Sequence, residues 1–284
     1  MLRLLKYDLK NIFKMWWIAA IALAGTTALG AISLYNIDTF GLSGSGDFSF
    51  LSDFSSLIGL WLWMVSVFAF IIISFILVCL RYYKNFFSDE GYLTFTLPVK
   101  RTQLFSSKLI ASFITISASL LLVTVSISTV VAVGMWISSS GNPLDVLRFF
   151  GELFTSSWEH YELGTSTAAS VVLSIFTLVV ILTAVLSEIL LMLFCMTVGG
   201  VVAKRGKFIV GLAIFYGAQS LFYYVTMIFM IMVTPLLEGQ FTTLSGYHIS
   251  CAIYLFILLI FFSVISAVCY FCSTYLLKEK LNLP

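Results

Sequence analysis

The chain has 284 residues, of which 61% are hydrophobic and only 10% are charged. Soluble domains are typically about one-quarter charged, so a soluble fold could not hide this much apolar surface from water. The net charge of +2, without a basic tract, gives no sign of a nucleic-acid partner. The composition predicts an integral membrane protein, and the length of its apolar runs predicts an all-α one.

Six stretches are long and apolar enough to cross the hydrocarbon core of a bilayer, which takes about 20 helical residues. Continuous helices satisfy their backbone polar groups internally, as lipid requires. We therefore expect a single transmembrane domain over residues 1–284, with spans at about 15–36, 57–80, 109–137, 168–203, 208–234 and 247–277.

The residues before the first span alternate between apolar and basic with helical spacing. The apolar face carries Leu2, Leu5, Leu9, Ile12 and Phe13, and the basic face carries Arg3, Lys6, Lys10 and Lys14. This pattern predicts an N-terminal amphipathic helix at the inner membrane surface, with its basic face toward anionic lipid headgroups.

The segment between the second and third spans, residues 81–108, has the pattern of a structured element. Ser88 is a suitable helix cap, and Asp89 and Glu90 would lie in the first turn, where carboxylates favour the positive end of a helix. Leu93 and Leu97 are apolar, and proline follows at position 98. We expect a compact cytoplasmic element that docks on another protein.

A second amphipathic segment is predicted between the third and fourth spans. Asn142 followed by Pro143 is a helix-start signal. Apolar residues then recur on one face of residues 142–154, which predicts an interfacial helix at the outer surface or a helix packed on the bundle.

Glu188 is the only acidic residue well inside a predicted span. Carboxylates at this depth usually face the bundle interior or water. Three roles stay open: lining a substrate path, binding a cation or proton, or bonding to a neighbouring helix. Ser187 and Thr183 are the nearest candidate partners.

The sequence offers no other chemistry. Cys269 and Cys272 form a CxxC pair inside a span, which favours two small residues one turn apart over a redox or zinc site. The spacing of the histidines and acids indicates neither a metal site nor a catalytic group, and a phosphate-binding loop is missing. We expect no enzymatic activity and no cofactor in this chain.

Orientation follows from the basic residues, because cytoplasmic loops are enriched in Lys and Arg. With six spans, every Lys and Arg except Arg148 falls on the side of the two termini. Both termini are therefore predicted to be cytoplasmic, in a multi-pass protein of the plasma membrane.

Residues 89–108 also resemble a known family. The resemblance is carried by Asp89-Glu90-Gly91-Tyr92-Leu93-Thr94, Leu97-Pro98-Val99, Arg101, Leu104 and Lys108. They are similar to the coupling segment of the six-helix permease subunits of type-two ABC exporters, in which Glu-Gly-Thr-Leu is followed by Pro-Val, a basic residue, Leu and Lys. Tyr92 departs from this pattern where the family often has Thr. The larger outer segment also lies between spans three and four, whereas the family's outer helices lie between the last two.

The resemblance implies a bacterial ATP-driven exporter of an amphiphilic substrate, either a peptide, a lipid or a drug-like compound. A coupling helix between spans 2 and 3 would dock on a cytoplasmic ABC ATPase subunit, which would hold ATP and magnesium. A second permease subunit, identical or homologous, would complete the path. The residues in contact with the ATPase would be Asp89, Glu90, Gly91, Leu93, Leu97, Pro98 and Arg101.

Two other functions fit a six-helix membrane protein. One is the substrate-binding module of a vitamin-type importer, which engages its ATPase through a separate membrane protein. The other is an immunity or sensor protein that acts by binding alone. Neither requires a coupling segment between spans 2 and 3.

Overall fold

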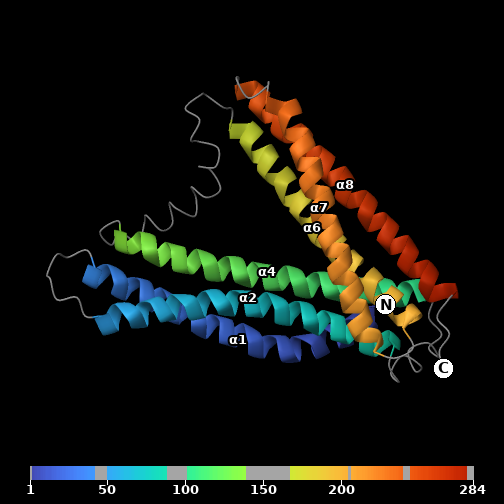
Figure 1. The fold of residues 1–284 in the computed structure, drawn as a ribbon, viewed down its shortest axis with the longest axis horizontal. Helices are drawn as coiled ribbons and strands as arrows, with labels where there is room; N and C mark the ends of the chain where they lie inside the picture. Colours follow the sequence, from blue (N-terminus) through green and yellow to red (C-terminus); the bar gives the residue numbers. More distant parts are fainter. Residues whose placement is uncertain are drawn as a thin grey trace. The chain divides into compact units, whose positions relative to one another are not determined.

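A computed structural model of the chain describes residues 2–41, 50–87, 101–138, 167–203, 206–238 and 244–279. All regular structure within these ranges is α-helical (Figure 1). The helices are α1 (Leu2–Gly41), α2 (Phe50–Phe87), α4 (Arg101–Ser138), α6 (Thr167–Val202), α7 (Lys207–Glu238) and α8 (Leu244–Glu279). Each of the six is long and apolar enough to cross a membrane, which confirms the predicted all-helical class and the number of candidate spans.

Each predicted span coincides with one of these helices, and every helix except α6 is longer than its predicted span. α1 has 40 residues, which corresponds to about 60 Å, or twice the thickness of a hydrocarbon core. The amphipathic first segment and the first span are thus one continuous helix. Hydropathy marks only the lipid-facing part of a helix, whereas its hydrogen-bonded backbone continues into the polar flanks.

The surfaces of the helices are as apolar as a membrane protein requires. Trp61 and Phe68 on α2 are 67% and 63% exposed, and Ile209 and Tyr216 on α7 are 72% and 77% exposed. Soluble monomers rarely expose apolar patches larger than a few hundred Å². The many large apolar side chains on the outside of these helices therefore indicate a multi-pass membrane protein.

The chain divides into two compact units. Unit 1 consists of Met1–Asp8, Cys79–Phe113 and Tyr161–Pro284, and unit 2 consists of Leu9–Val78 and Ile114–His160. Unit 1 therefore contains α6, α7 and α8 together with the first turns of α1, the end of α2 and the start of α4. Residues 88–100, the part of the chain between α2 and α4 that contains most of the predicted coupling segment (residues 89–108), connect two parts of unit 1.

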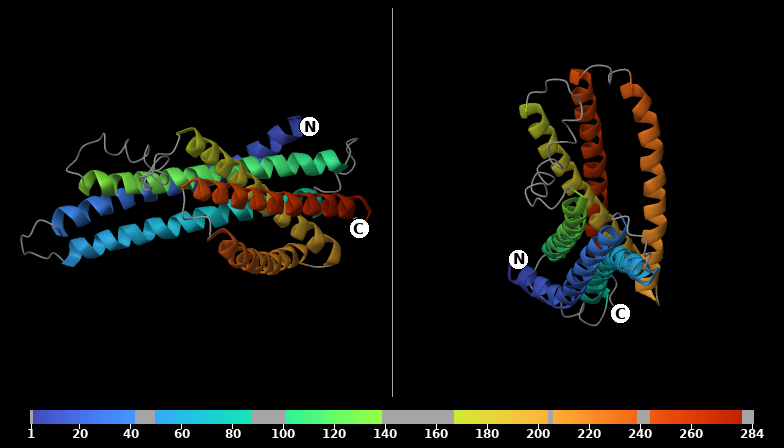
Figure 2. Two further views of the ribbon diagram at one scale, coloured as in Figure 1. Left: turned by 90° about the horizontal axis from the view of Figure 1, so that it is seen from above. Right: turned by 90° about the vertical axis from the view of Figure 1, so that its left-hand side faces the viewer.

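Unit 2 is a bundle of α1, α2 and α4, which lie side by side (Figure 2). Two tryptophans bind α4 from different helices. The Trp16 indole N–H donates to Ser119 Oγ at 2.7 Å, and the Trp63 N–H donates to Ser126 Oγ at 3.0 Å. A buried indole needs such an acceptor. The apolar core around them contains Trp16, Ala20, Leu23, Val67, Phe70 and Val123.

Unit 1 is centred on α6, which contacts both α7 and α8 (Figures 1 and 2). The buried face of α6 includes Ile189, Leu190, Met192, Leu193, Cys195 and Met196. α6 and α7 cross closely because Gly199 faces Gly211. A Cβ at Gly199 would lie 2.5 Å from the Gly211 Cα. Small residues at a helix–helix contact permit such a close crossing.

The turn between α6 and α7 also depends on glycine. The Ala203 N–H donates to the Gly199 carbonyl at 3.1 Å, which ends α6, and the Val210 N–H donates to the Gly206 carbonyl at 3.1 Å, which begins α7. Gly206 has a φ of 67°, in the left-handed region that glycine adopts without steric penalty.

Candidate functional site

The predicted ATPase contact falls almost entirely outside the described residues. Asp89, Glu90, Gly91, Leu93, Leu97 and Pro98 all lie in residues 88–100, which the structure does not describe. Arg101 is the first residue of α4. The predicted outer helix, residues 142–154, also lies outside the described ranges. The flanks of residues 88–100, at the end of α2 and the start of α4, lie in unit 1.

Both ends of the segment are anchored by buried side chains. At the end of α2, Tyr82 and Phe86 are 2% and 1% exposed. At the start of α4, Leu104 and Phe105 are 1% and 0% exposed. The ring centres of Tyr82 and Phe105 lie 6.4 Å apart, in an edge-to-face arrangement. The two helices that lead into and out of residues 88–100 therefore pack directly against each other.

Residues at the start of α4 also contact α8. The Phe105 ring lies 5.6 Å from the Tyr270 ring, and Ser106 Oγ lies 3.3 Å from the Tyr270 hydroxyl, within hydrogen-bonding distance. Residues at the end of α2 also contact the end of α6 and the start of α7. The Tyr83 ring lies 5.5 Å from the Phe208 ring, and the space beside Gly200 is filled by Phe87. Within unit 1, the flanks of residues 88–100 therefore contact α7, α8 and the end of α6.

A buried charged cluster completes the anchor. Asp8 of α1 is 3% exposed and forms an ion pair with Lys108 of α4, which is 6% exposed. The Asp8 carboxylate also accepts hydrogen bonds from Arg81 and Asn85 of α2, each at 3.5 Å. Side chains from α2 and α4 thus contact one carboxylate on α1. An isolated buried carboxylate would be strongly unfavourable, and the two cations compensate for its lost hydration.

The role of Asp8 is not evident from the sequence, although a signal for it exists. Asp8 follows Leu5 by three residues and precedes Ile12 by four, so it lies on the apolar face of the amphipathic helix. In the structure Ile12 is buried and Leu5 is half-buried, whereas Lys6, Lys10 and Lys14 are exposed. A carboxylate on an apolar face requires a cationic partner, but the pattern cannot identify Lys108 as that partner.

Glu188 has a partner on the adjacent helix α7. The Gln219 side-chain N–H donates to Glu188 Oε1 at 3.2 Å, and both side chains are half-buried. The suggested partners bond elsewhere. Ser187 Oγ donates to the Ala184 carbonyl and Thr183 Oγ1 to the Val180 carbonyl, both on their own helix. Consecutive helical residues point in different directions, which explains why Ser187 does not reach Glu188.

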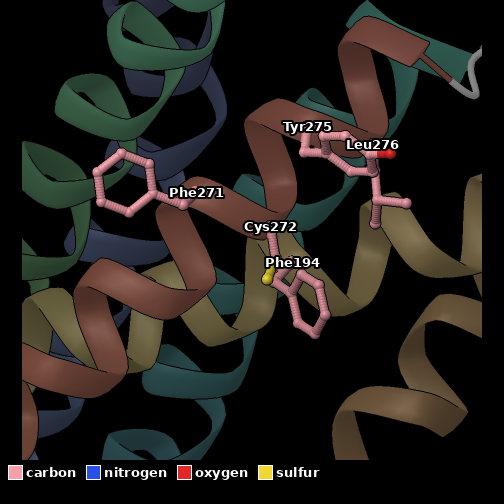
Figure 3. A pocket seen from close by; sticks show the side chains of 5 residues that line it. All are labelled: Phe194, Phe271, Cys272, Tyr275 and Leu276. Carbon is pink, nitrogen blue, oxygen red and sulfur yellow. The ribbon is translucent and has the colours of Figure 1, made fainter.

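An open apolar groove of about 430 Å³ lies on the surface of unit 1 between α6 and α8. Its lining residues are Phe194, Phe271, Cys272, Tyr275 and Leu276, and Cys272 lies beside the Phe194 ring (Figure 3). Cys272 is exposed whereas Cys269 is buried, so the two thiols of the CxxC pair have different environments. Among the described residues, no three His, Cys, Asp or Glu side chains come together as a metal site would require.

Buried aromatic rings and a shared carboxylate hold together the first turns of α1, the end of α2 and the start of α4. No protein-family model, no curated protein and no solved structure matches the chain.

Proposed function

We propose that the chain is the permease subunit of a bacterial ABC exporter of the type-two class, and that residues 89–108 contain its coupling segment. The proposal begins from the resemblance of residues 89–108 to that family's coupling segment. Asp89, Glu90, Gly91, Leu93, Leu97, Pro98 and Arg101 would contact a cytoplasmic ATPase subunit. ATP and magnesium would be bound by that subunit.

The observation that carries the proposal is the anchoring of both flanks of residues 88–100 in unit 1. A coupling segment transmits force only if the helices on either side of it are firmly held. Tyr82 and Phe105 provide apolar contacts between these flanks, and Asp8 and Lys108 add an ion pair between α1 and α4. A surface loop without mechanical function would not need such support.

The proposed orientation has both termini in the cytoplasm. The Lys and Arg residues favour it, since all but Arg148 fall on that side of the six spans. The exposed side chains of Lys6, Lys10 and Lys14 support a basic surface on the first turns of α1 that faces anionic headgroups of the inner leaflet. The cell membrane of a bacterium is the proposed location.

The proposed substrate is amphiphilic, either a peptide, a lipid or a drug-like compound. The described surfaces of the helices are strongly apolar, which suits a substrate that enters from the bilayer. A path for it would form between two permease subunits, identical or homologous. Glu188, half-buried in α6, is proposed to line the path or to hold α6 to α7 through Gln219.

Purification of the tagged chain from its native membrane in mild detergent, followed by mass spectrometry, tests the proposal. We expect an ABC ATPase subunit to copurify with the wild type and to be depleted by Glu90→Ala combined with Leu97→Ala. The matched control is Glu152→Ala combined with Leu147→Ala, which makes the same chemical change in the predicted outer segment. That control should retain the ATPase subunit.

A chain that purifies without any ATPase subunit, in wild type and variants alike, would overturn the proposal. Retention of a tightly bound small molecule in that case would favour an importer's substrate-binding module. Purification with neither an ATPase subunit nor a small molecule would favour an immunity or sensor protein that acts by binding alone.

A further inference from the structure

The cluster around Asp8 joins the N-terminal turns of the chain to both ends of the proposed coupling segment. Arg81 and Asn85 lie seven and three residues before residue 88, and Lys108 lies eight residues after residue 100. Eight residues are about two turns, or about 12 Å of helix. One carboxylate on α1 therefore contacts α2 just before the segment and α4 just after it.

The charges of the cluster are interdependent. Asp8 contributes one negative charge, and Lys108 and Arg81 contribute two positive charges, of which the Lys108 ammonium is almost completely buried. Replacement of Asp8 by a neutral side chain would remove the carboxylate that both cations contact. The buried Lys108 would then lose this compensation for its lost hydration, and the contacts of α1 with α2 and α4 would loosen.

An ion cluster is a poor way to add stability, because an apolar group of the same volume often does as well or better. The distinctive property of an ion cluster is that its hydrogen bonds are directional. Hydrogen-bonded charges fix the rotation and the axial register of the helices that carry them, whereas apolar side chains tolerate sliding. Register between α1, α2 and α4 is what a coupling segment held between α2 and α4 would need.

We propose that Asp8 is a positioning residue that locks the first turns of α1 to the ends of α2 and α4, so that these three elements move as one body when the ATPase subunit acts on residues 88–100. This inference rests on the proposed function. It adds that the N-terminal helix is a third moving part of the coupling apparatus. Asp8 acts through Lys108 and Arg81 and does not contact the ATPase or the substrate.

The lock can be tested by distance measurements on the full chain. Tyr7 is 70% exposed and Lys84 is exposed, and the two residues neighbour Asp8 and Asn85 in sequence. Cysteines at these two positions, in a chain whose natural cysteines are replaced by alanine or serine, would carry nitroxide labels. Double electron–electron resonance in lipid nanodiscs should give a narrow distance distribution that ATP and vanadate do not change.

Three variants and one control define the outcome. Asp8→Asn should broaden the distribution, and Asp8→Glu should restore it because the carboxylate is retained. Arg81→Met should broaden it to a smaller degree, since the buried Asp8–Lys108 pair remains. Arg81→Met also provides the answer if Asp8→Asn does not fold. Lys10→Met, which removes an exposed cation from the same helix, should leave the distribution unchanged.

ATP hydrolysis by the purified complex gives a second readout. Asp8→Asn should lower the maximal rate by roughly 2- to 30-fold, the range in which residues remote from a ligand site alter coupling. The KM for ATP should not change, because the ATP site is on another chain. Asp8→Glu should recover most of the rate.

The failure of this inference is distinguishable from failure of the proposed function. If the wild type carries no ATPase subunit, the proposed function fails, whereas the distance measurement on the chain alone still decides whether Asp8 locks the helices. If Asp8→Asn, or Arg81→Met when that variant must be used, keeps a narrow distribution, the lock is refuted. A lower melting temperature with unchanged distances and hydrolysis would make Asp8 a structural residue only.

Discussion

Replacement of Gly199 by alanine should force α6 and α7 apart. The new Cβ would lie 2.5 Å from the Gly211 Cα and the Gly211 N, whereas ordinary contact begins at 3.4 Å. The helices would have to separate by the difference, about 0.9 Å, because backbone atoms cannot rotate out of the way. Gly211 is confined in turn, since a Cβ there would meet Met196 Sδ at 2.8 Å.

The size of the effect follows from two opposing terms. Overpacking a close contact costs about 1–3 kcal/mol. Replacing a helical glycine by alanine contributes about 0.5–1 kcal/mol of stability through the lower entropy of the unfolded chain. The control is Gly217→Ala on α7, where a Cβ would meet nothing within 4 Å and only the favourable term applies.

The two variants should therefore differ by about 1–3 kcal/mol. Their melting temperatures in detergent should then differ by about 2–12 °C. The assay is size-exclusion chromatography of the tagged protein after heating at a series of temperatures. Gly199→Ala should lose its monodisperse peak at a lower temperature than wild type, and Gly217→Ala should match or exceed wild type. Equal stability of the two variants would refute the close crossing of α6 and α7.

Three further predictions concern other contacts. Trp16→Phe removes the donor to Ser119 and part of the core of unit 2, so it should destabilise the protein by about 1–2 kcal/mol in a thermal shift assay. Trp17 is 59% exposed, so the control Trp17→Phe should have little effect. Glu188→Gln should keep the melting temperature of wild type, whereas Glu188→Leu, which leaves the Gln219 amide without this acceptor, should lower it. An equal fall in melting temperature for both variants would show that the hydrogen bond to Gln219 is not the only role of Glu188. The orientation can be tested with a membrane-impermeant maleimide in a chain whose natural cysteines are replaced. It should label Lys84→Cys only in inside-out vesicles and Tyr35→Cys only in right-side-out vesicles. The reverse pattern would overturn the proposed orientation.

The number and order of the helices could be predicted because lipid imposes one strong requirement. A span must be about 20 apolar residues long, and such runs are visible directly in the sequence. The ends of the helices could not be predicted in this way. α2 continues from the predicted end at residue 80 to Phe87 because Tyr82 and Phe86 are buried in unit 1. Their burial is a property of helix packing, which hydropathy does not measure.

The candidate site was predicted less completely than the fold. The segment 81–108 stands out through its capping residues, acids and proline, but Glu90 and its neighbours lie outside the described residues. Glu188 was recognised as an acid in an apolar span, whereas its partner Gln219 was not. Gln219 lies 31 residues further along the chain. Only the docking of α7 on α6 brings the two side chains together.

Lys108 shows how a family resemblance and a physical contact can explain the same residue in different terms. In the sequence it belongs to the motif that ends the proposed coupling segment. In unit 1 it is a nearly buried cation, and such a cation is tolerated only where a carboxylate compensates for its lost hydration. Asp8 provides that carboxylate from α1, 100 residues away in sequence. Asp8, on the first turns of the chain, thus compensates for the burial of this lysine. If residues 89–108 are a coupling segment, this ion pair joins the N-terminal helix to it.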